Sequence, residues 1–266
     1  MIPYSYHVHT DFSCDCRVPM ATMCRAALDA GLAEVGFADH FDTHPKDPCF
    51  GYLRLDAWWE SLRRCRDEFG PMGLAVKAGI EIGEPHHARA AVDTLLAQYE
   101  WDFVLGSLHW VGNESLYDGD YFRRHTPEEV YRTYFGELAT MCETGQFDIL
   151  AHADIVKYVS YEAYGGYDSR RWESEMRPAL ALCAARGIAI EVNAGTLRRR
   201  IKELTPTRLP LTWYREAGGE HVTYGSDAHH TEHIAIGAAD ALTEIRAAGF
   251  TRLAAYTRRK PSWAAI

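Results

Sequence analysis

Short apolar runs alternate with longer amphipathic segments along almost the whole chain, and this alternation restricts the fold more than any other feature. The runs are YSYHV (4–8), EVGFA (34–38), LAVKAGI (74–80), DFVLGS (102–107), FDILA (147–151), IAIEV (188–192) and HVTYG (221–225). Each has the length of a β-strand, and strands that alternate with helices are typical of βα units in a parallel sheet. The pattern therefore predicts an α/β protein with seven such units.

Helical segments are expected between these runs, at 19–30, 56–69, 86–100, 127–144, 169–186, 207–217 and 235–248. Proline near the start and glycine just past the end are usual boundaries of a helix, as with Pro19 and Gly31. A loop-like stretch at 41–55 contains two prolines, but no low-complexity linker divides the series. A chain of 266 residues can bury one large core, so we predict one barrel-like domain over residues 1–266.

Charge and hydropathy limit the partners that we expect. The net charge of −9 gives no overall basic field for a nucleic-acid backbone, so we expect no nucleic-acid partner. No stretch approaches the roughly 18 uncharged apolar residues of a membrane helix, and the first residues show no leader pattern. We therefore expect a cytoplasmic protein with no membrane partner, and the pattern does not define an oligomeric state. An anionic substrate would need a local cluster of cations, which bound metals would supply.

The seven cysteines include no CxxC pair and allow two interpretations. Cys14 and Cys16 lie close in sequence to His7 and His9, a spacing that would suit a soft-metal site. Small free thiols, buried or exposed, are the simpler interpretation, and it is the one that we favour.

Residue types that bind metals fall at or just past the C-terminal ends of the predicted strands. These residues are His7, His9, Asp39, His40, Glu81, His109, His152, Asp227 and His229. Each alone has an ordinary explanation: a lone HxH pattern often consists of surface or core residues with no role in a site, and a single buried histidine usually has a hydrogen-bond partner. In a β/α barrel, however, the C-terminal strand ends form one rim, where active sites are built. Their coincidence at that rim predicts a metal centre.

Mixed imidazole and carboxylate ligands suit zinc, manganese or iron better than calcium, which prefers oxygen cages. The sequence does not choose among the three metals. The remaining histidines fall outside this pattern. We expect five at the solvated surface: His44, His86, His87, His125 and His221. His230 and His233 follow Asp227 and would either line the same cavity or have no role in it.

Several motifs occur in one order along the chain: HVHTDFSCD, GFADH, GIEIGE, GSLHW, LAHADIVKY, EVNAGTLR and YGSDAH. Together they resemble the polymerase-and-histidinol-phosphatase (PHP) superfamily, and within it the monofunctional histidinol-phosphate phosphatases. The resemblance spans residues 7 to 260 and includes the tail GFTRLAAYTRRKP. It implies a distorted (β/α)7 TIM-like barrel with a trinuclear metal centre. It also implies that L-histidinol phosphate is hydrolysed to L-histidinol and phosphate in histidine biosynthesis.

The resemblance also implies three sets of metal ligands. One metal would be held by His7, His9, Glu81 and Asp227; a second by the bridging Glu81 with His109 and His152; and a third by Asp15, His40 and His229. Position 15 is a departure, because many relatives have histidine there. A carboxylate at this position would still bind a hard or borderline cation, with a changed metal preference or occupancy. The segment NAGTLR departs from the Asn-Thr-Ser-Gly form of the family, although Arg198 keeps its place.

The implied mechanism is direct hydrolysis without a covalent intermediate. Two cations that share Glu81 would lower the pKa of a bridging water, so that hydroxide forms near neutral pH. Arg198 would bind the phosphoryl oxygens, with Lys157 as a second candidate. The leaving alkoxide must be protonated or bound by a metal, and Asp227 or His229 would assist this step. Acidic residues would face the ammonium and imidazole of the substrate, and the unranked candidates are Asp42, Glu84 and Asp154.

Other functions stay open on the sequence alone. The same metal cage would serve other phosphate esters, including nucleotides and phosphotyrosine. A polymerase-associated exonuclease is disfavoured by the acidic charge and by the lack of a basic stripe. A non-catalytic metal-binding barrel is disfavoured because every ligand position that we can place is filled.

Overall fold

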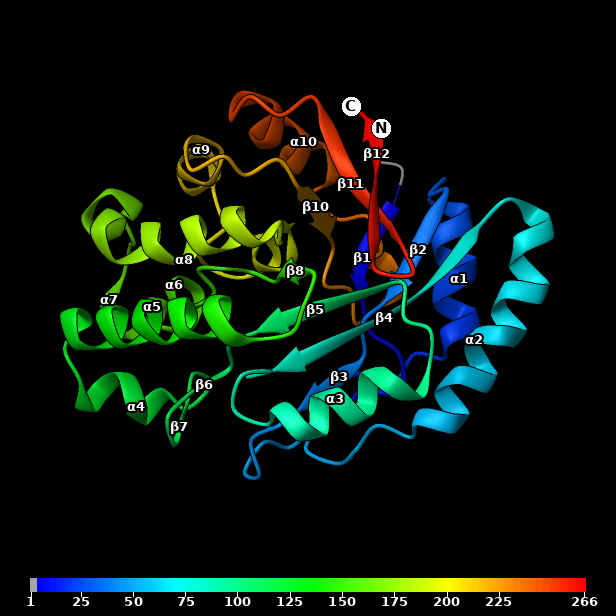
Figure 1. Cartoon of the computed structure of the whole chain (residues 1–266), viewed down its shortest axis with the longest axis horizontal. Helices are drawn as coiled ribbons and strands as arrows, with labels where there is room; N and C mark the ends of the chain where they lie inside the picture. The colour runs from blue at the N-terminus through cyan, green and yellow to red at the C-terminus, as the bar shows by residue number, and fades with distance from the viewer. Residues whose placement is uncertain (1–3) are drawn as a thin grey trace.

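Seven parallel strands form a nearly closed barrel, as the sequence predicts (Figure 1). The computed structural model describes residues 4–266. In their order around the barrel, the strands are β1 (Tyr4–Val8), β2 (Glu34–Phe37), β4 (Ala75–Gly83), β5 (Phe103–Ser107), β8 (Ile149–Leu150), β9 (Ala189–Asn193) and β10 (Val222–Gly225). Each strand overlaps one predicted run, and neighbouring strands pair in parallel. The strands β1, β5, β9 and β10 are buried along their whole length, as expected for a parallel sheet covered on both faces.

The barrel closes between β1 and the segment that follows β10. The amide of Asp227 donates a hydrogen bond to the carbonyl of His7 (2.8 Å), and the amide of His9 donates to the carbonyl of Ala228 (3.0 Å). Val8 and Ala228 form an isolated parallel bridge at the same place. Residues that follow the first and the last strand of the barrel therefore lie side by side.

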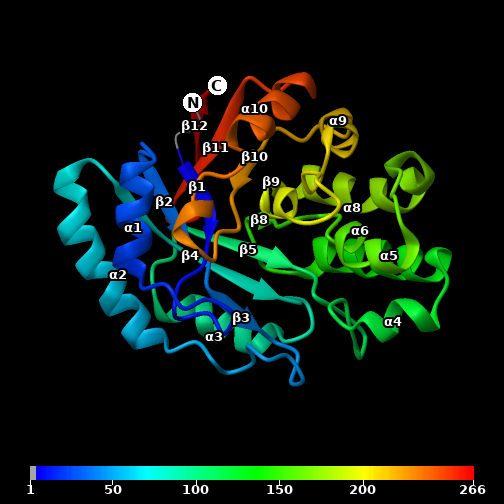
Figure 2. The same ribbon diagram turned by 180° about the vertical axis from the view of Figure 1, so that it is seen from behind.

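The main helices surround this barrel in Figures 1 and 2. They are α1 (Met20–Asp29), α2 (Leu55–Phe69), α3 (Arg89–Gln98), α5 (Pro127–Thr144), α8 (Glu173–Arg186), α9 (Arg208–Glu216) and α10 (Ala238–Ala247). Each lies close to a predicted segment. Thr126 and Glu129 form a reciprocal capping box at the start of α5, which explains its well-predicted boundary. The predicted helix at 169–186 is split, because its first turn is the 3-10 helix η2 (Ser169–Trp172).

Smaller elements are added to the predicted series. They are the strand β3 (His40–Asp42), the hairpins β6 (Trp110–Val111) with β7 (Glu114–Ser115) and β11 (Arg252–Thr257) with β12 (Lys260–Ala265), the helices α4 (Gly119–Arg124), α6 (Val156–Val159) and α7 (Tyr161–Tyr164), and the 3-10 helices η1 (Gly70–Met72), η3 (Gly195–Arg198) and η4 (Thr231–His233). β3 pairs in parallel with β4, so the start of the expected loop at 41–55 is strand instead. Between residues 4 and 266, none of the helices has the length and apolar character that a membrane crossing requires.

Stacked aromatic rings fill the N-terminal end of the barrel. The ring of Tyr6 lies 4.0 Å from that of Tyr4 and 4.8 Å from that of Phe103, measured between centroids. Gly36 and Gly79 pass directly against the Phe103 ring, and a Cβ atom at either position would collide with it. The C-terminal end of the barrel, in contrast, is occupied by buried polar side chains.

Candidate metal centre

Glu81, in β4, lies at the centre of the polar end of the barrel, with 1% of its side chain exposed. Five histidine rings surround its carboxylate. The distances from Oε2 are 3.2 Å to His7 Nε2, 3.3 Å to His40 Nδ1 and 3.5 Å to His9 Nε2, and those from Oε1 are 3.0 Å to His152 Nε2 and 3.5 Å to His109 Nε2. The histidines come from β1, from β3 and from the segments after β1, β5 and β8. The fold therefore brings five of the predicted metal-binding histidines onto one carboxylate.

Asp227 approaches the same group from the segment after β10. Its Oδ1 atom lies 3.5 Å from His9 Nε2, 3.6 Å from His229 Nδ1 and 3.9 Å from His7 Nε2. Asp227 (φ 52°) and His152 (φ 26°) both adopt positive φ, which is uncommon for residues other than glycine. Such backbone strain often occurs at functional sites, where the surrounding structure maintains it.

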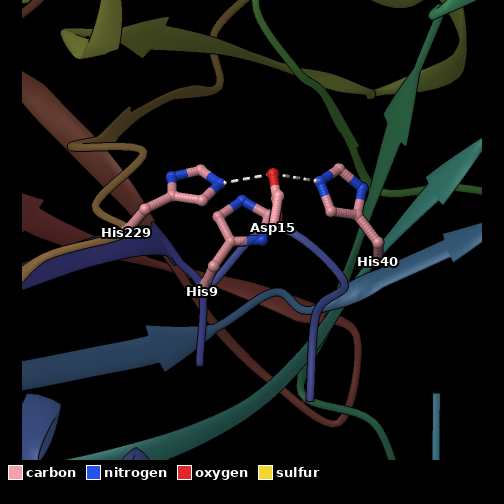
Figure 3. A group of neighbouring side chains, drawn as sticks. All are labelled: His9, Asp15, His40 and His229. Atoms are coloured by element: carbon pink, nitrogen blue, oxygen red, sulfur yellow. Dashed lines mark hydrogen bonds and ion pairs between the residues drawn. The ribbon is translucent and has the colours of Figure 1, made fainter. Parts of the chain in front are cut away.

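Asp15 lies beside the imidazoles of His9, His40 and His229 (Figure 3). Its Oδ2 atom is 2.8 Å from His229 Nε2 and 3.6 Å from His40 Nε2. One ligand atom from each of these four residues lies within 4.8 Å of the other three. The grouping extends the expected third set by one residue, because His9 faces Asp15 as well as Asp227.

Side chains outside the three implied ligand sets orient three of the histidines: a carboxylate contacts two of them, and a serine hydroxyl contacts the third. His7 Nδ1 is 2.7 Å from Glu191 Oε1, and His109 Nδ1 is 3.0 Å from Asp42 Oδ1. His9 Nδ1 is 3.1 Å from Ser13 Oγ, which in turn donates to Asp39. A carboxylate or hydroxyl partner on the far ring nitrogen is the usual way to fix a metal-binding imidazole.

Four buried atoms that face the centre lack a hydrogen-bond partner among the described residues: His7 Nε2, His9 Nε2, His40 Nδ1 and Glu81 Oε2. Each buried polar atom that lacks a hydrogen-bond partner destabilises the folded state by about 1–3 kcal/mol. Imidazole nitrogens and carboxylate oxygens are the ligands that borderline divalent cations prefer. The residues present therefore fit a metal centre with more than one cation.

Two of the ligands, Glu81 and His9, already have the charge state that metal binding requires. Burial raises the pKa of Glu81, but the neighbouring His7 and His40 outweigh it and hold the pKa well below its ordinary value. Burial lowers the pKa of His9 to about 4, and the nearby His229 adds to this effect. The carboxylate is thus ionised and the His9 imidazole is neutral at pH 7, as metal binding requires. Burial lowers the pKa of His7, His40 and His109, but the neighbouring carboxylates outweigh it and raise the pKa of all three rings, so a cation would displace protons from them.

A cavity of about 610 Å³ opens above the centre. It is lined by His9, Asp15, His40, Glu81, His109, Tyr117, His152, Ile155, Tyr158, Gly195, Thr196, Arg198, Arg199, Asp227, His229, His230 and His233. Arg198 is fixed at its edge, because its guanidinium donates to the carbonyls of Ser226 (3.2 Å) and Asp227 (2.9 Å). Neither Tyr117, exposed after β7, nor Tyr158, half-buried in α6, is predicted from the sequence, since no pattern distinguishes them from other tyrosines.

The structure does not bring Lys157 into this cavity, and its predicted contact with the phosphate is wrong. Its side chain is fully buried, and Nζ donates to the carbonyl of Leu204 (2.7 Å) and lies 3.0 Å from Asp154 Oδ2. Asp154 is thereby paired, and Glu84 is buried where it accepts hydrogen bonds from the amides of His109 and Trp110. Neither carboxylate lines the cavity, so neither meets the substrate as expected.

Three further expectations are wrong at particular residues. Only 3% of the His86 side chain is exposed, because the ring pairs with Glu137 at 2.7 Å. His44 is also buried and stacks on Trp110, with 3.8 Å between ring centroids. Cys14 forms a disulfide bond with Cys49 instead of remaining a free thiol. The other five cysteines are free and buried.

Comparison with known proteins gives consistent matches. A family model described as the PHP domain matches residues 5–195. The histidinol-phosphatase of Lactococcus lactis subsp. lactis is 25% identical over 260 residues, covering 96% of this chain and 94% of that protein. The "probable histidinol-phosphatase" of Clostridium acetobutylicum is 27% identical over 245 residues, covering 90% and 91% respectively.

A solved structure supports the same fold. It is the histidinol phosphate phosphatase of Lactococcus lactis subsp. lactis, determined in complex with zinc, L-histidinol and phosphate. It matches with a TM-score of 0.88 at 23% sequence identity, and the match covers 98% of each chain. The barrel and its surrounding helices are therefore shared along nearly the whole length of both proteins.

Proposed function

The chain belongs to the PHP domain family, and from this premise we propose that it is a metal-dependent phosphatase that hydrolyses L-histidinol phosphate. The curated relatives above support the reaction, because both are named histidinol-phosphatases. The whole chain, residues 1–266, would act as one domain with two or three divalent cations of zinc, manganese or iron at the strand ends.

The observation that carries the proposal is the set of unpartnered nitrogen and oxygen atoms around Glu81. His7, His9, Glu81 and Asp227 would hold one cation, and His109 and His152 would hold a second that shares Glu81. Asp15, His40 and His229 would hold the third. Divalent cations at such a site make a water acidic enough to supply hydroxide near neutral pH and neutralise the oxygens of a phosphate.

The residues around the cations would orient the substrate. Arg198 has five N–H donors, and its contacts with the Ser226 and Asp227 carbonyls hold the guanidinium plane at the edge of the cavity. The remaining donors would bind phosphoryl oxygens, for which a planar guanidinium is well suited. Asp227 and His229 are the candidates to assist departure of the alkoxide. Glu191 and Asp42 would keep the His7 and His109 rings aimed at the cations.

Phosphate release from a panel of esters tests the substrate. Protein reconstituted separately with manganese, zinc and iron would be assayed with L-histidinol phosphate, p-nitrophenyl phosphate, nucleoside monophosphates and phosphotyrosine. We expect the highest kcat/KM with L-histidinol phosphate. A higher kcat/KM with another ester would retain the phosphatase and reject this substrate. No release from any ester by fully metal-loaded protein would reject the phosphatase.

A further inference from the structure

The disulfide between Cys14 and Cys49 joins two loops beside the metal centre. Their Cα atoms are 5.2 Å apart, although the residues are separated by 35 positions in the sequence. Cys14 directly precedes Asp15, the carboxylate that faces His40 and His229. Cys49 belongs to the loop that follows β3. The covalent bond therefore lies one residue away from a predicted metal ligand.

On its C-terminal side, Asp15 is anchored by the buried Cys16, whose Sγ donates to the carbonyls of His9 (3.6 Å) and His229 (3.3 Å). The hairpin-like loop is closed by hydrogen bonds from the Asp11 amide to the Val18 carbonyl and from the Ser13 amide to the Thr10 carbonyl. Within the described part of the chain, the main chain of residues 14–16 forms no hydrogen bond with other main-chain groups. The Asp15 side chain is 45% exposed, unlike the buried Glu81. Asp15 is thus restrained through Cys16 on one side, and the disulfide at Cys14 supplies the covalent restraint on the other.

The loop at the other end of the disulfide is firmly attached to the site. Asp47 accepts hydrogen bonds from the Cys49 amide (2.7 Å) and from the Trp110 indole (2.8 Å). His44 stacks on the same indole, with 3.8 Å between ring centroids. Trp110 directly follows His109, a predicted ligand of the second cation. A chain of contacts therefore runs from the His109 segment through the disulfide to Asp15.

We propose that the Cys14–Cys49 disulfide is a positioning element for Asp15, so that binding of the cation at Asp15, His40 and His229 depends on this bond. The inference rests on the proposed metal centre. A carboxylate on a single methylene reaches less far than an imidazole ring, so aspartate at position 15 requires a better-fixed backbone. The disulfide supplies that restraint by limiting the conformations open to the loop.

Cleaving the bond in the folded protein tests the proposal. A water-soluble phosphine breaks the S–S bond; the two sulfurs leave as thiols with two protons, and the phosphine becomes the phosphine oxide with the oxygen of water. Manganese is the probe, because zinc would also bind the new thiols. After removal of the phosphine, manganese would be titrated into metal-free oxidised protein, reduced protein and the C14S/C49S variant. Mass spectrometry would count the free thiols.

We expect reduction and C14S/C49S to weaken the weakest manganese site by about 10- to 100-fold, the range for disrupted outer-shell partners of a metal. The tighter sites should keep their affinity, and C14S/C49S should not respond to the phosphine. Equal manganese affinities in all three forms would overturn the proposal. This titration needs no substrate, so it remains decisive even if no phosphate ester is hydrolysed.

Hydrogen exchange separates local positioning from general loosening of the fold. In reduced protein we expect faster exchange at residues 11–18 and 43–54, with unchanged protection in β4, β5 and β9. Faster exchange throughout the barrel would contradict a positioning role, because the disulfide would then support the whole fold.

Discussion

Several candidate ligands at the metal centre are oriented by partners that the sequence does not identify. Glu191 illustrates this, because its Oε1 atom contacts His7 Nδ1 from 184 residues away, and its Oε2 atom accepts from the His152 amide (2.9 Å). From the sequence, Glu191 can be recognised only as a carboxylate in an otherwise apolar predicted strand, which gives no indication of its partners. One side chain thus holds the ring of His7 and the main chain of His152, two of the residues that surround Glu81.

Replacing Glu191 with glutamine should weaken metal binding while the barrel stays folded. The amide nitrogen would replace an oxygen that now accepts a hydrogen bond, either at His7 or at the His152 amide. We expect manganese affinity to fall by about 10- to 100-fold, as for other outer-shell partners. Calorimetric titration measures it, and Glu60→Gln, on the exposed surface of α2, is the matched control. An unchanged affinity in Glu191→Gln would show that Glu191 does not support the centre.

His86 gives a pH-dependent prediction that is independent of the metal centre. Burial lowers the pKa of this imidazole, and the contact with Glu137 only partly opposes that shift. The folded state favours the neutral ring, so near and below pH 6.5, the ordinary pKa, the unfolded chain binds more protons than the folded one. The free energy of unfolding therefore decreases as the pH is lowered. Asparagine does not titrate there. Urea unfolding should therefore show that the stability advantage of wild type over His86→Asn shrinks between pH 7.5 and 5; a constant advantage would contradict this account.

The residues that bind metal could be predicted because their types recur at strand ends and match family motifs. Most of their orienting partners could not, since the pairings of Glu191 with His7 and of Asp42 with His109 join distant segments. Lys157 shows the opposite error. A cation within a recognised motif suggested phosphate binding, but its ammonium is used to pair with Asp154 in the interior.

At the scale of elements, the seven strands could be predicted because both faces of a parallel sheet select continuous apolar runs. β3 was not predicted, since its three residues, His40–Asp42, include two site residues and carry no apolar pattern. The β11–β12 hairpin was not predicted either. Its second strand is largely exposed and contains Pro261, which is typical of an edge strand.

Gly79→Ala tests how tightly the aromatic end of the barrel is packed. A Cβ atom at residue 79 would collide with the Phe103 ring, which is packed inside the barrel and cannot move away freely. We expect a loss of about 1–3 kcal/mol in the free energy of unfolding, as for other overpacked cores. Gly136→Ala is the control, because an added Cβ on the exposed face of α5 contacts nothing within 4 Å. That substitution should be neutral or stabilise by up to about 1 kcal/mol. Equal stabilities in urea would contradict the packing argument.

At the scale of the whole molecule, closure of the barrel completes the site. The PHP domain match ends at residue 195, yet Asp227 and His229 follow β10 and reach the centre because that segment hydrogen-bonds to β1. The chain carries a net charge of −9, so the attraction for a phosphate must be local, from the proposed cations and from Arg198 and Arg199 in the cavity lining. The central claim is thus that hydrolysis depends on cations held around Glu81.

Metal content and phosphate release, measured on the same preparations of wild type and Glu81→Gln, test that claim most directly. Both proteins would be stripped with a chelator, checked for native circular dichroism, and assayed with L-histidinol phosphate before and after manganese is restored. We predict that stripped wild type is inactive and recovers with manganese, whereas Glu81→Gln binds less manganese and turns over at least about 100-fold more slowly. Full turnover by stripped wild type, or wild-type turnover by Glu81→Gln, would contradict the account.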